Sequence, residues 1–287
     1  MKIHSLTIGL DVGSTTVKAV VCNDQLEILW RDYQRHEARQ HQKVNELLSA
    51  IKNEYCDQHH FNLVITGSGG GALTASLKAR FVQEVNAVSL AVEHLHPRAG
   101  SVVELGGQDA KIILFKASAV TDSKRKILSM NDKCAGGTGT VIDKIRAKLN
   151  IEETDLPNYG FDGIKTHPVA AKCGVFAETD INGLQKSGVP TEQLMASLFD
   201  AIVLQNLTVL TRGNTLEPEV VLLGGPNMFL PGLVQAWRYH IVNIWQERGH
   251  KIPTDKAIDK IIYVPDDAQY YAAIGAVIFC QQNSVSV

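Results

Sequence analysis

Hydrophobic and polar residues alternate along two stretches of the chain in a way that predicts the same three-stranded unit twice. Residues 6–22, LTIGLDVGSTTVKAVVC, predict a strand, a tight glycine turn and a second strand, and LEILWRDY (26–33) predicts a third strand. Residues 101–115, SVVELGGQDAKIILF, predict another strand, glycine turn and strand, with KILSM (126–130) as the third strand.

The two units align at a constant offset of 93 residues. This offset matches Asp11 with Glu104, Gly13 with Gly106, Ser14 with Gly107 and Lys18 with Lys111. Because an acid, a glycine and a lysine recur in one register, the sequence predicts an internal duplication. The alternative is a pair of unrelated hairpins that have similar turns.

The remaining pattern alternates between helices and strands. Helical spacing of apolar residues predicts helices over 42–55, 139–149, 175–187, 190–210 and 268–280. Strands are predicted at 61–66, before the glycine-rich TGSGGGAL, at 219–223, before a diglycine, and at 261–265. A helix, a strand and a helix are expected up to about residue 97, and Thr140 with Asp143 resembles a capping box.

This order of elements predicts a mixed α/β fold with two duplicated domains, each a mixed β-sheet flanked by helices. We expect an N-terminal domain at 1–97, onto which the closing helix 268–280 can pack back. The C-terminal domain is expected at 98–287 and carries the cysteine motifs.

Composition narrows the functional classes. The chain has 287 residues and a formal net charge of -2, and its densest basic run, 124–126, is too short to indicate nucleic-acid binding. No apolar stretch is expected to span a membrane, and the N-terminus reaches a glycine turn too soon for a signal peptide. The five cysteines form no dense framework, which favours a reducing compartment, the cytoplasm.

The glycine turns are candidate phosphate sites, since glycine lets backbone N–H groups approach phosphate oxygens. Two such turns could grip a polyphosphate from both sides. The sequence contains neither a GxxxxGK[ST] motif nor a GxGxxG that opens a helix after the first strand. The candidate phosphate- and nucleotide-binding residues are Gly13, Ser14, Thr15, Thr16, Lys18, Gly106, Gly107, Gly136, Gly137, Thr138, Gly139, Gly224 and Gly225.

Acidic residues at the strand ends suggest a metal and a catalytic role. Asp11 and Glu104 suit a hydrated Mg²⁺, which prefers oxygen ligands and keeps its waters. Gln108 and Asp109 either orient the attacking water, bind Mg²⁺ through water or cap the hairpin turn. Asp11 is a further catalytic candidate. Lys18 either neutralises phosphate charge or is a solvated strand residue, and for Glu178 contact with the nucleotide ribose and a favourable helix-dipole position both stay open.

The motifs GLDVGSTTVK, ELGGQDAK and LLGGP resemble the two phosphate motifs and the adenosine motif of the actin/hexokinase/Hsp70 superfamily of ATPases. Within it, MNDKCAGGTGT and AAKCGVFAETD closely resemble the BadF/BadG/BcrA/BcrD family, over essentially the whole chain. The resemblance implies an actin-like ATPase fold of the ribonuclease H-like type around a nucleotide cleft. It also implies ATP hydrolysis coupled to low-potential electron transfer, through a [4Fe–4S] cluster held in a homodimer.

Two cysteines match the cluster motifs, Cys134 and Cys173, and both precede predicted helix N-termini, which stabilise thiolates. A [4Fe–4S] cluster takes four thiolates, so two per chain fit a two-fold dimer. The alternatives are buried structural cysteines or a Zn²⁺ site. Cys22, Cys56 and Cys280 are expected to be core or incidental residues.

The family implies a partner: a 2-hydroxyacyl-CoA dehydratase, or a reductase related to benzoyl-CoA reductase, with neither nucleic acid nor membrane involved. Two other functions stay open. A small-molecule kinase of the same fold would not need paired cysteines, and a nucleotide-binding regulatory domain would not hydrolyse ATP. LLGGPNMFLPGL also resembles activator domains fused in tandem, in which a cluster would bridge two linked domains.

Overall fold

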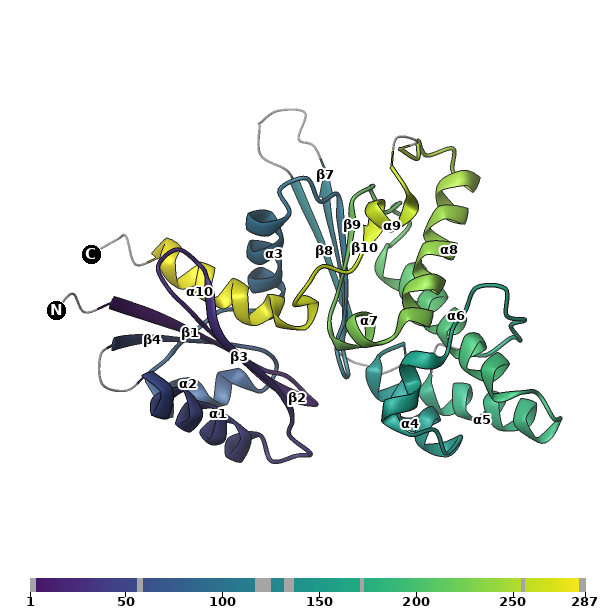
Figure 1. Cartoon of the computed structure of the whole chain (residues 1–287). Helices are drawn as coiled ribbons and strands as arrows, with labels where there is room; N and C mark the ends of the chain where they lie inside the picture. The colour runs from purple at the N-terminus through teal and green to yellow at the C-terminus, as the bar shows by residue number, and fades with distance from the viewer. Residues whose placement is uncertain are drawn as a thin grey trace. The chain divides into compact units, whose positions relative to one another are not determined.

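The computed structural model of the chain describes residues 4–55, 59–116, 125–131, 137–170, 173–253 and 256–283. The chain forms two compact units: unit 1 contains Met1–Pro97 and Gln269–Val287, and unit 2 contains Arg98–Ala268. Each unit is built on a five-stranded mixed sheet flanked by helices, as the sequence pattern predicts (Figure 1).

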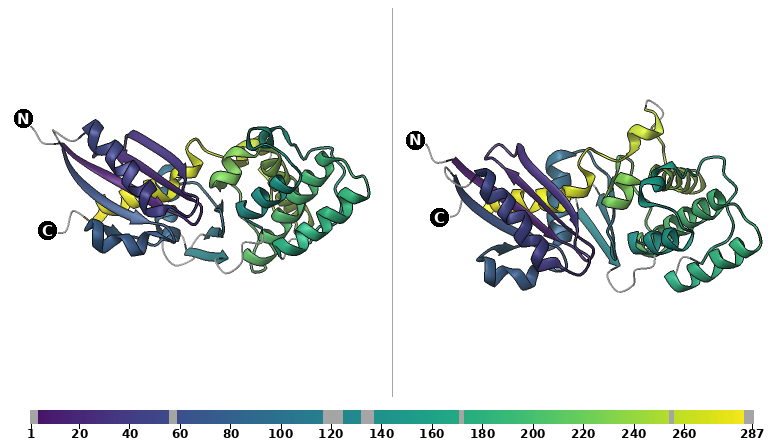
Figure 2. Two further views of the ribbon diagram at one scale, coloured as in Figure 1. Left: turned by 90° about the horizontal axis from the view of Figure 1, so that it is seen from below. Right: turned by 60° about the horizontal axis from the view of Figure 1, so that its bottom comes forward.

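Unit 1 has the strand order β3-β2-β1-β4-β5, with β1, β2 and β3 antiparallel and β4 and β5 added in parallel to β1. Its elements are β1 (His4–Val12), β2 (Thr16–Cys22), β3 (Ile28–Arg35), α1 (Gln40–Tyr55), β4 (His59–Thr66), η1 (Gly70–Leu73), α2 (Thr74–Leu77), β5 (Arg80–Phe81), α3 (Glu84–Leu95) and α10 (Tyr271–Asn283). The closing helix α10 packs on α3 and on the sheet of this unit. Figure 2 shows α10, in yellow, against the purple strands from two further directions.

Unit 2 repeats the topology with the order β8-β7-β6-β9-β10, in which β9 and β10 again extend the sheet in parallel. Its elements are β6 (Ser101–Leu105), β7 (Ala110–Lys116), β8 (Arg125–Asn131), α4 (Gly139–Lys148), η2 (Glu153–Asn158), α5 (Gly174–Lys186), α6 (Thr191–Leu210), β9 (Val220–Leu223), α7 (Gly225–Phe229), α8 (Pro231–Glu247), α9 (Ile258–Ile261) and β10 (Ile262–Tyr263). A short helix, η3 (Ala268–Tyr270), spans the boundary between the units.

The duplication extends to the register of the strands and to their buried faces. Asp11 pairs with Lys18 across β1 and β2, and Glu104 pairs with Lys111 across β6 and β7. The side chains that enter the two main cores also match at the 93-residue offset: Leu10, Val12, Val17, Ala19 and Val21 in unit 1, and Val103, Leu105, Ala110, Ile112 and Leu114 in unit 2. Side chains alternate between the two faces of a strand, so the repeated pattern of apolar residues buries the same face of the sheet in both units.

Three features differ from the sequence pattern or go beyond it. Helix α6 has the length and composition of a membrane span, but 67% of its 18-residue apolar window is buried inside the protein, which accounts for its apolarity. The capping box is wrong, since α4 begins at Gly139 and the Thr140 hydroxyl binds the Gly107 carbonyl oxygen instead. Helix α8 was not predicted, although Leu233, Trp237, Ile241 and Trp245 recur at helical spacing and are buried.

Close packing of α10 on α3 yields a stability prediction. A Cβ atom at Gly275 would overlap the carbonyl oxygen of Ala87, whereas one at Gly183 of α5 would meet no atom within 4 Å. We expect Gly275→Ala to lower the free energy of unfolding by about 1–3 kcal/mol through overpacking. Gly183→Ala should leave it unchanged or raise it by up to ~1 kcal/mol, because alanine favours helix. Urea unfolding measures both, and equal effects would contradict the packing.

Candidate functional site

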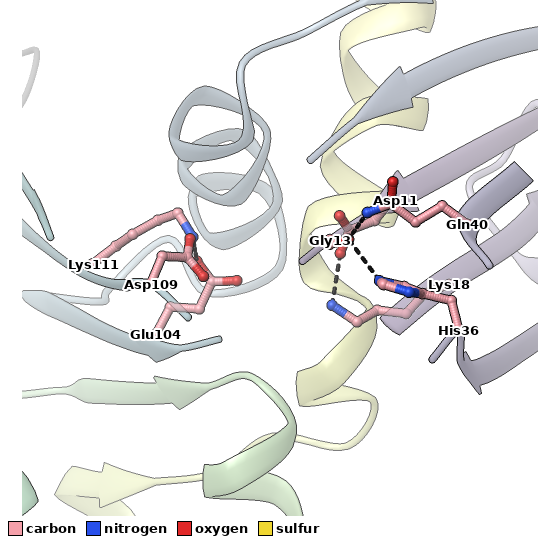
Figure 3. Close-up of polar contacts among 8 residues, drawn as sticks. All are labelled: Asp11, Gly13, Lys18, His36, Gln40, Glu104, Asp109 and Lys111. Atoms are coloured by element: carbon pink, nitrogen blue, oxygen red, sulfur yellow. Dashed lines mark hydrogen bonds and ion pairs between the residues drawn. The ribbon is translucent and has the colours of Figure 1, made fainter. Parts of the chain in front are cut away.

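The glycine turn of unit 1 joins β1 to β2 and is held from outside by two side chains. The Gly13 N–H donates to the Thr16 carbonyl oxygen at 2.9 Å and closes the turn around Ser14 and Thr15. The Gly13 carbonyl oxygen accepts from Gln40 Nε2 at 3.1 Å and lies 3.2 Å from His36 Nε2 (Figure 3). Neither His36 nor Gln40 was among the predicted site residues.

The turn of unit 2 has the same geometry and is held by the start of α4. The Gly106 N–H donates to the Asp109 carbonyl oxygen at 2.9 Å, and the Gly106 carbonyl oxygen accepts from Gly139 N at 3.1 Å. The Gly107 carbonyl oxygen accepts from Thr140 N at 2.8 Å, from Thr140 Oγ1 at 2.6 Å and from Thr138 Oγ1 at 2.9 Å. Thr138 is fully buried, so its hydroxyl holds the turn.

Both turns present backbone N–H groups at matching positions. Within the described part of the chain, no protein acceptor is found for the N–H groups of Ser14 and Thr15, or for those of Gly107 and Gln108. Two successive N–H groups in a turn form an anion-binding concavity. A Cβ atom at Gly106 would overlap the Asp109 carboxylate, so a larger residue there would displace this side chain.

A buried carboxylate–lysine pair lies at the base of each turn (Figure 3). Lys18 Nζ lies 2.7 Å from Asp11 Oδ2, and the Asp11 side chain is fully buried. Lys111, also fully buried, lies 3.1 Å from Glu104 Oε2 and forms an ion pair with Asp109. Burial alone lowers the pKa of Lys18, but the Asp11 charge and hydrogen bond outweigh it and hold the pKa above its usual value. Lys18 is therefore not a solvated strand residue.

One oxygen of the unit 1 pair has no protein partner among the described residues. Asp11 Oδ1 is buried without a hydrogen bond, and so is Thr66 Oγ1, which belongs to the residue paired with Asp11 in the parallel register of β1 and β4. A buried carboxylate oxygen of this kind is costly unless it binds water or a cation. The observation fits a hydrated magnesium ion beside Asp11.

The third predicted glycine turn meets the second within unit 2. Gly224 has φ +91° after β9, and a Cβ atom there would overlap the Leu105 carbonyl oxygen, while Gly225 is buried as the first residue of α7. A Cβ atom at Gly139 would lie 3.1 Å from Pro226 Cγ and 3.6 Å from Gly107 Cα. The turn at 224–226 and the start of α4 therefore pack against the 106–107 turn.

Two buried amide side chains that the sequence analysis did not single out support these turns. Asn206 of α6 donates to the Gly137 carbonyl oxygen at 2.8 Å. Asn227 donates to the Leu223 carbonyl oxygen at 2.8 Å and accepts from Trp237 Nε1 at 3.0 Å. The spacing of these residues along the chain gave no sign of their partners, because two of the three contacts, Asn206–Gly137 and Asn227–Trp237, join separate segments.

Of the two predicted cluster cysteines, Cys173 is described, whereas Cys134 lies outside the described residues, together with Gly136. Cys173 is half-buried and is the N-cap residue of α5. The next two apolar side chains, Val175 and Phe176, are 60% and 62% exposed. Among the described residues, no three His, Cys, Asp or Glu side chains gather into a metal site.

Two other described cysteines differ from Cys173 in their surroundings. Cys22 and Cys280 are buried, as expected for core residues. Burial raises the pKa of the Cys22 thiol to about 12, so it does not ionise near neutral pH. Cys56, like Cys134, lies outside the described residues.

Three other predicted site residues, Gln108, Asp109 and Glu178, differ in their contacts. Gln108 is exposed at the tip of its turn, and Asp109 is bound to Lys111. Glu178 lies 2.6 Å from Lys144 Nζ and 2.7 Å from Lys148 Nζ, which bridges α5 to α4. Neither of the two roles considered for Glu178 included this bridge. Lys111, which the 93-residue offset matches with Lys18, is a further site residue that was not among the predicted phosphate-binding residues.

The two sheets have the same strand order, and the first hairpin of each contains an acidic residue, a glycine turn and a lysine. This arrangement is an actin-like ATPase fold. The chain belongs to the BadF/BadG/BcrA/BcrD ATPase family, whose family model matches residues 8–280. It is 22% identical over 279 residues to the (R)-2-hydroxyglutaryl-CoA dehydratase activating ATPase of Acidaminococcus fermentans, covering 97% of this chain and 98% of that protein.

Two further comparisons agree on the fold and on the extent of the match. An uncharacterized protein of Methanocaldococcus jannaschii, MJ0004, is 26% identical over 275 residues and is matched along 95% of this chain and 100% of its own length. The solved structure of the activator of 2-hydroxyisocaproyl-CoA dehydratase from Clostridium difficile, with bound ADPNP, superposes with a TM-score of 0.77. That alignment has 22% identity and covers 98% of this chain and 96% of the other. This confirms the predicted fold class and family.

The buried lysine of unit 2 yields a second stability prediction. Lys111→Met leaves Glu104 and Asp109 close together without their countercharge, so we expect the free energy of unfolding to fall by about 3–5 kcal/mol. The matched control is Lys43→Met, which removes a lysine 2.6 Å from Glu46 on the surface of α1 and should change stability by no more than ~1 kcal/mol. Chemical denaturation of both variants checks this, and a Lys111 effect no larger than the control would contradict the burial argument.

Proposed function

We propose that this protein is an ATP-hydrolysing activator that donates a low-potential electron to an acyl-CoA dehydratase or reductase partner. Its two repeated units would represent duplicated ATPase domains. The observation that carries the proposal is the position of Cys173, which is half-buried at the N-terminus of α5, in the same unit as a glycine turn with open N–H groups. The names of the relatives, which include two dehydratase activators and one subunit of the benzoyl-CoA reductase of Thauera aromatica, support the choice of partner.

In this proposal the phosphates of ATP bind to the backbone N–H groups of the Ser14–Thr15 and Gly107–Gln108 turns. The hydroxyl groups of Ser14 and Thr15 add donors, and the buried Thr16 keeps the closing position of the turn. The diglycine Gly224–Gly225 lies beside the second turn and suits the adenosine part of the nucleotide. The Clostridium difficile activator, which was solved with ADPNP bound, supports a nucleotide in this fold.

Asp11 is proposed to hold Mg²⁺ through water, since its Oδ1 is buried and lacks a protein partner among the described residues. Glu104 is the matching carboxylate of unit 2. Lys18 neutralises the charge of Asp11, and Lys111 neutralises that of Glu104, before the metal–nucleotide complex binds. Gln108 and Asp109 are the proposed residues that orient the attacking water, because the exposed tip of the turn places Gln108 beside the open N–H groups.

Cys134 and Cys173 are the proposed thiolate ligands of a [4Fe–4S] cluster shared by two copies of the chain. The residues that the structure describes fit this group: Cys173 is half-buried and is the N-cap residue of α5, and a helix N-terminus favours negative charge. Such a cluster supplies one-electron transfer at low potential. Val175 and Phe176 expose apolar surface directly after Cys173, which suits burial against a second copy. A reducing cytoplasm would be required.

The proposal predicts the metal content of anaerobically purified protein. We expect about two iron atoms and two sulfides per chain, because four of each are shared by two chains. Cys134→Ser and Cys173→Ser should each lose the iron and the associated visible absorbance. The control Cys280→Ala, at a buried cysteine of α10, should retain both. The measurements are iron and sulfide analysis, absorbance and release of inorganic phosphate from ATP.

Each alternative function gives a different result. Iron-free protein, zinc in place of iron, or iron that survives both serine substitutions would overturn the proposed cluster. A small-molecule kinase would transfer phosphate to an added acceptor and contain no iron. A regulatory nucleotide-binding domain would bind ATP without releasing phosphate.

A further inference from the structure

The glycine turn of unit 2 is joined to helix α4 by a dense set of hydrogen bonds. Four of them connect the Gly106 and Gly107 carbonyl oxygens to the first residues of α4 and its N-cap, Thr138, at distances of 2.6–3.1 Å. A displacement of the turn therefore cannot occur without a displacement of the start of α4, unless these bonds break. The turn that presents open N–H groups therefore moves together with the start of α4.

Helix α4 is in turn joined to α5 at two levels. Near the N-termini the contact is apolar and close, since a Cβ atom at Gly174 would lie 3.1 Å from Val141 Cγ2. One turn further along α5, the Glu178 carboxylate accepts from Lys144 at 2.6 Å through one oxygen and from Lys148 at 2.7 Å through the other. Each oxygen of one carboxylate is therefore bound to a different turn of α4.

This bridge is charged throughout the physiological pH range. Hydrogen bonds from Lys144 and Lys148 lower the pKa of Glu178 to about 2. The carboxylate is only partly exposed, with 23% of its side-chain surface accessible, whereas Lys144 is 52% exposed. An isolated surface pair adds little to stability. Here both oxygens of one carboxylate are bound by lysines from successive turns of α4, which limits how α5 can move against α4.

We propose that Glu178 is a positioning residue that couples the phosphate-binding turn at Gly106–Gly107 to Cys173 by holding α4 and α5 as one body. This inference rests on the proposed function and adds the route by which the nucleotide state reaches the cysteine. Cys173 responds because it is bonded directly into α5, where its carbonyl oxygen accepts from Ala177 N at 3.0 Å. Glu178 touches neither nucleotide nor thiol, so it acts only through the geometry of the helix pair.

The structure also indicates that the bridge can be removed without unfolding α5. Ala177 and Ile181 of α5 are buried in the main core of unit 2, and they hold the helix from its other side. Glu178→Gln keeps the size of the side chain and removes its charge. The variant should therefore unfold at the same denaturant concentration as the wild type. It should differ only in how much nucleotide binding changes hydrogen–deuterium exchange in α5.

The test is hydrogen–deuterium exchange, followed by mass spectrometry, on the full chain with and without Mg²⁺ and ADPNP. In the wild type, nucleotide should slow exchange in the 106–109 turn, in α4 and in the first two turns of α5, by at least about fivefold, the lower end of typical couplings between sites. In Glu178→Gln the turn and α4 should still respond as in the wild type, and the response of α5 should be smaller, because only the apolar contact between the two helices remains.

Two further variants sharpen the comparison. Lys144→Met combined with Lys148→Met should reproduce the Glu178→Gln result, because it removes the bridge from the other side. Glu46→Gln is the matched control: Glu46 also accepts from a helical lysine and a neighbouring donor, but on α1 of unit 1. It should behave as the wild type in all three segments.

An α5 response in Glu178→Gln as large as in the wild type would overturn the proposal, and so would a wild type in which the turn responds and α5 does not. A wild type in which no segment responds would also overturn it, because nothing would then be transmitted from the turn. None of these readings uses iron content, so loss of the coupling and absence of a cluster are recorded separately.

Discussion

The arrangement depends on a buried lysine that neutralises a carboxylate at the end of the first strand in each unit. Lys18 and Lys111 are each bound across a hairpin to an acid, Asp11 or Glu104. A buried charge is tolerated only when it is paired and hydrogen-bonded, so each hairpin has one stable register. That register fixes where the glycine turn falls and which of its N–H groups are left open. The same pairing, used twice, makes the two units alike in topology as well as in sequence.

A second constraint, the attachment of the glycine turn to a helix N-terminus, operates only in unit 2. The Gly107 carbonyl oxygen accepts three hydrogen bonds from Thr138 and Thr140, and Gly139 packs against Gly107 and Pro226. In unit 1 the corresponding support comes from two side chains, His36 and Gln40, both outside a helix interior. The duplication has thus kept the turn and changed what holds it. In unit 2 the support is the start of α4. A displacement of the turn therefore also displaces this helix.

The sequence predicted the fold well because its strongest signals are local and repeated. Strand alternation, glycine turns and the 93-residue offset of Asp11 and Lys18 from Glu104 and Lys111 identified both sheets and their shared register. The resemblance of the cysteine motifs identified the family. What the sequence did not supply were contacts between distant elements. Asn206, Asn227 and the bridge from Glu178 to Lys144 and Lys148 depend on helix packing, which no spacing along one helix encodes. Thr138 is a further example, since its hydroxyl donates to the Gly107 carbonyl oxygen, a contact that the sequence alone does not reveal.

The central proposal is that nucleotide phosphates bind to the backbone N–H groups of the glycine turns. Amide resonances of ¹⁵N-labelled protein, recorded during titration with Mg²⁺ and ADPNP, test it most directly. The account predicts that the amides of Ser14, Thr15, Gly107 and Gln108 shift together and saturate at one nucleotide concentration. If these four amides keep their positions while others in the chain shift and saturate, the nucleotide binds elsewhere and the account is contradicted.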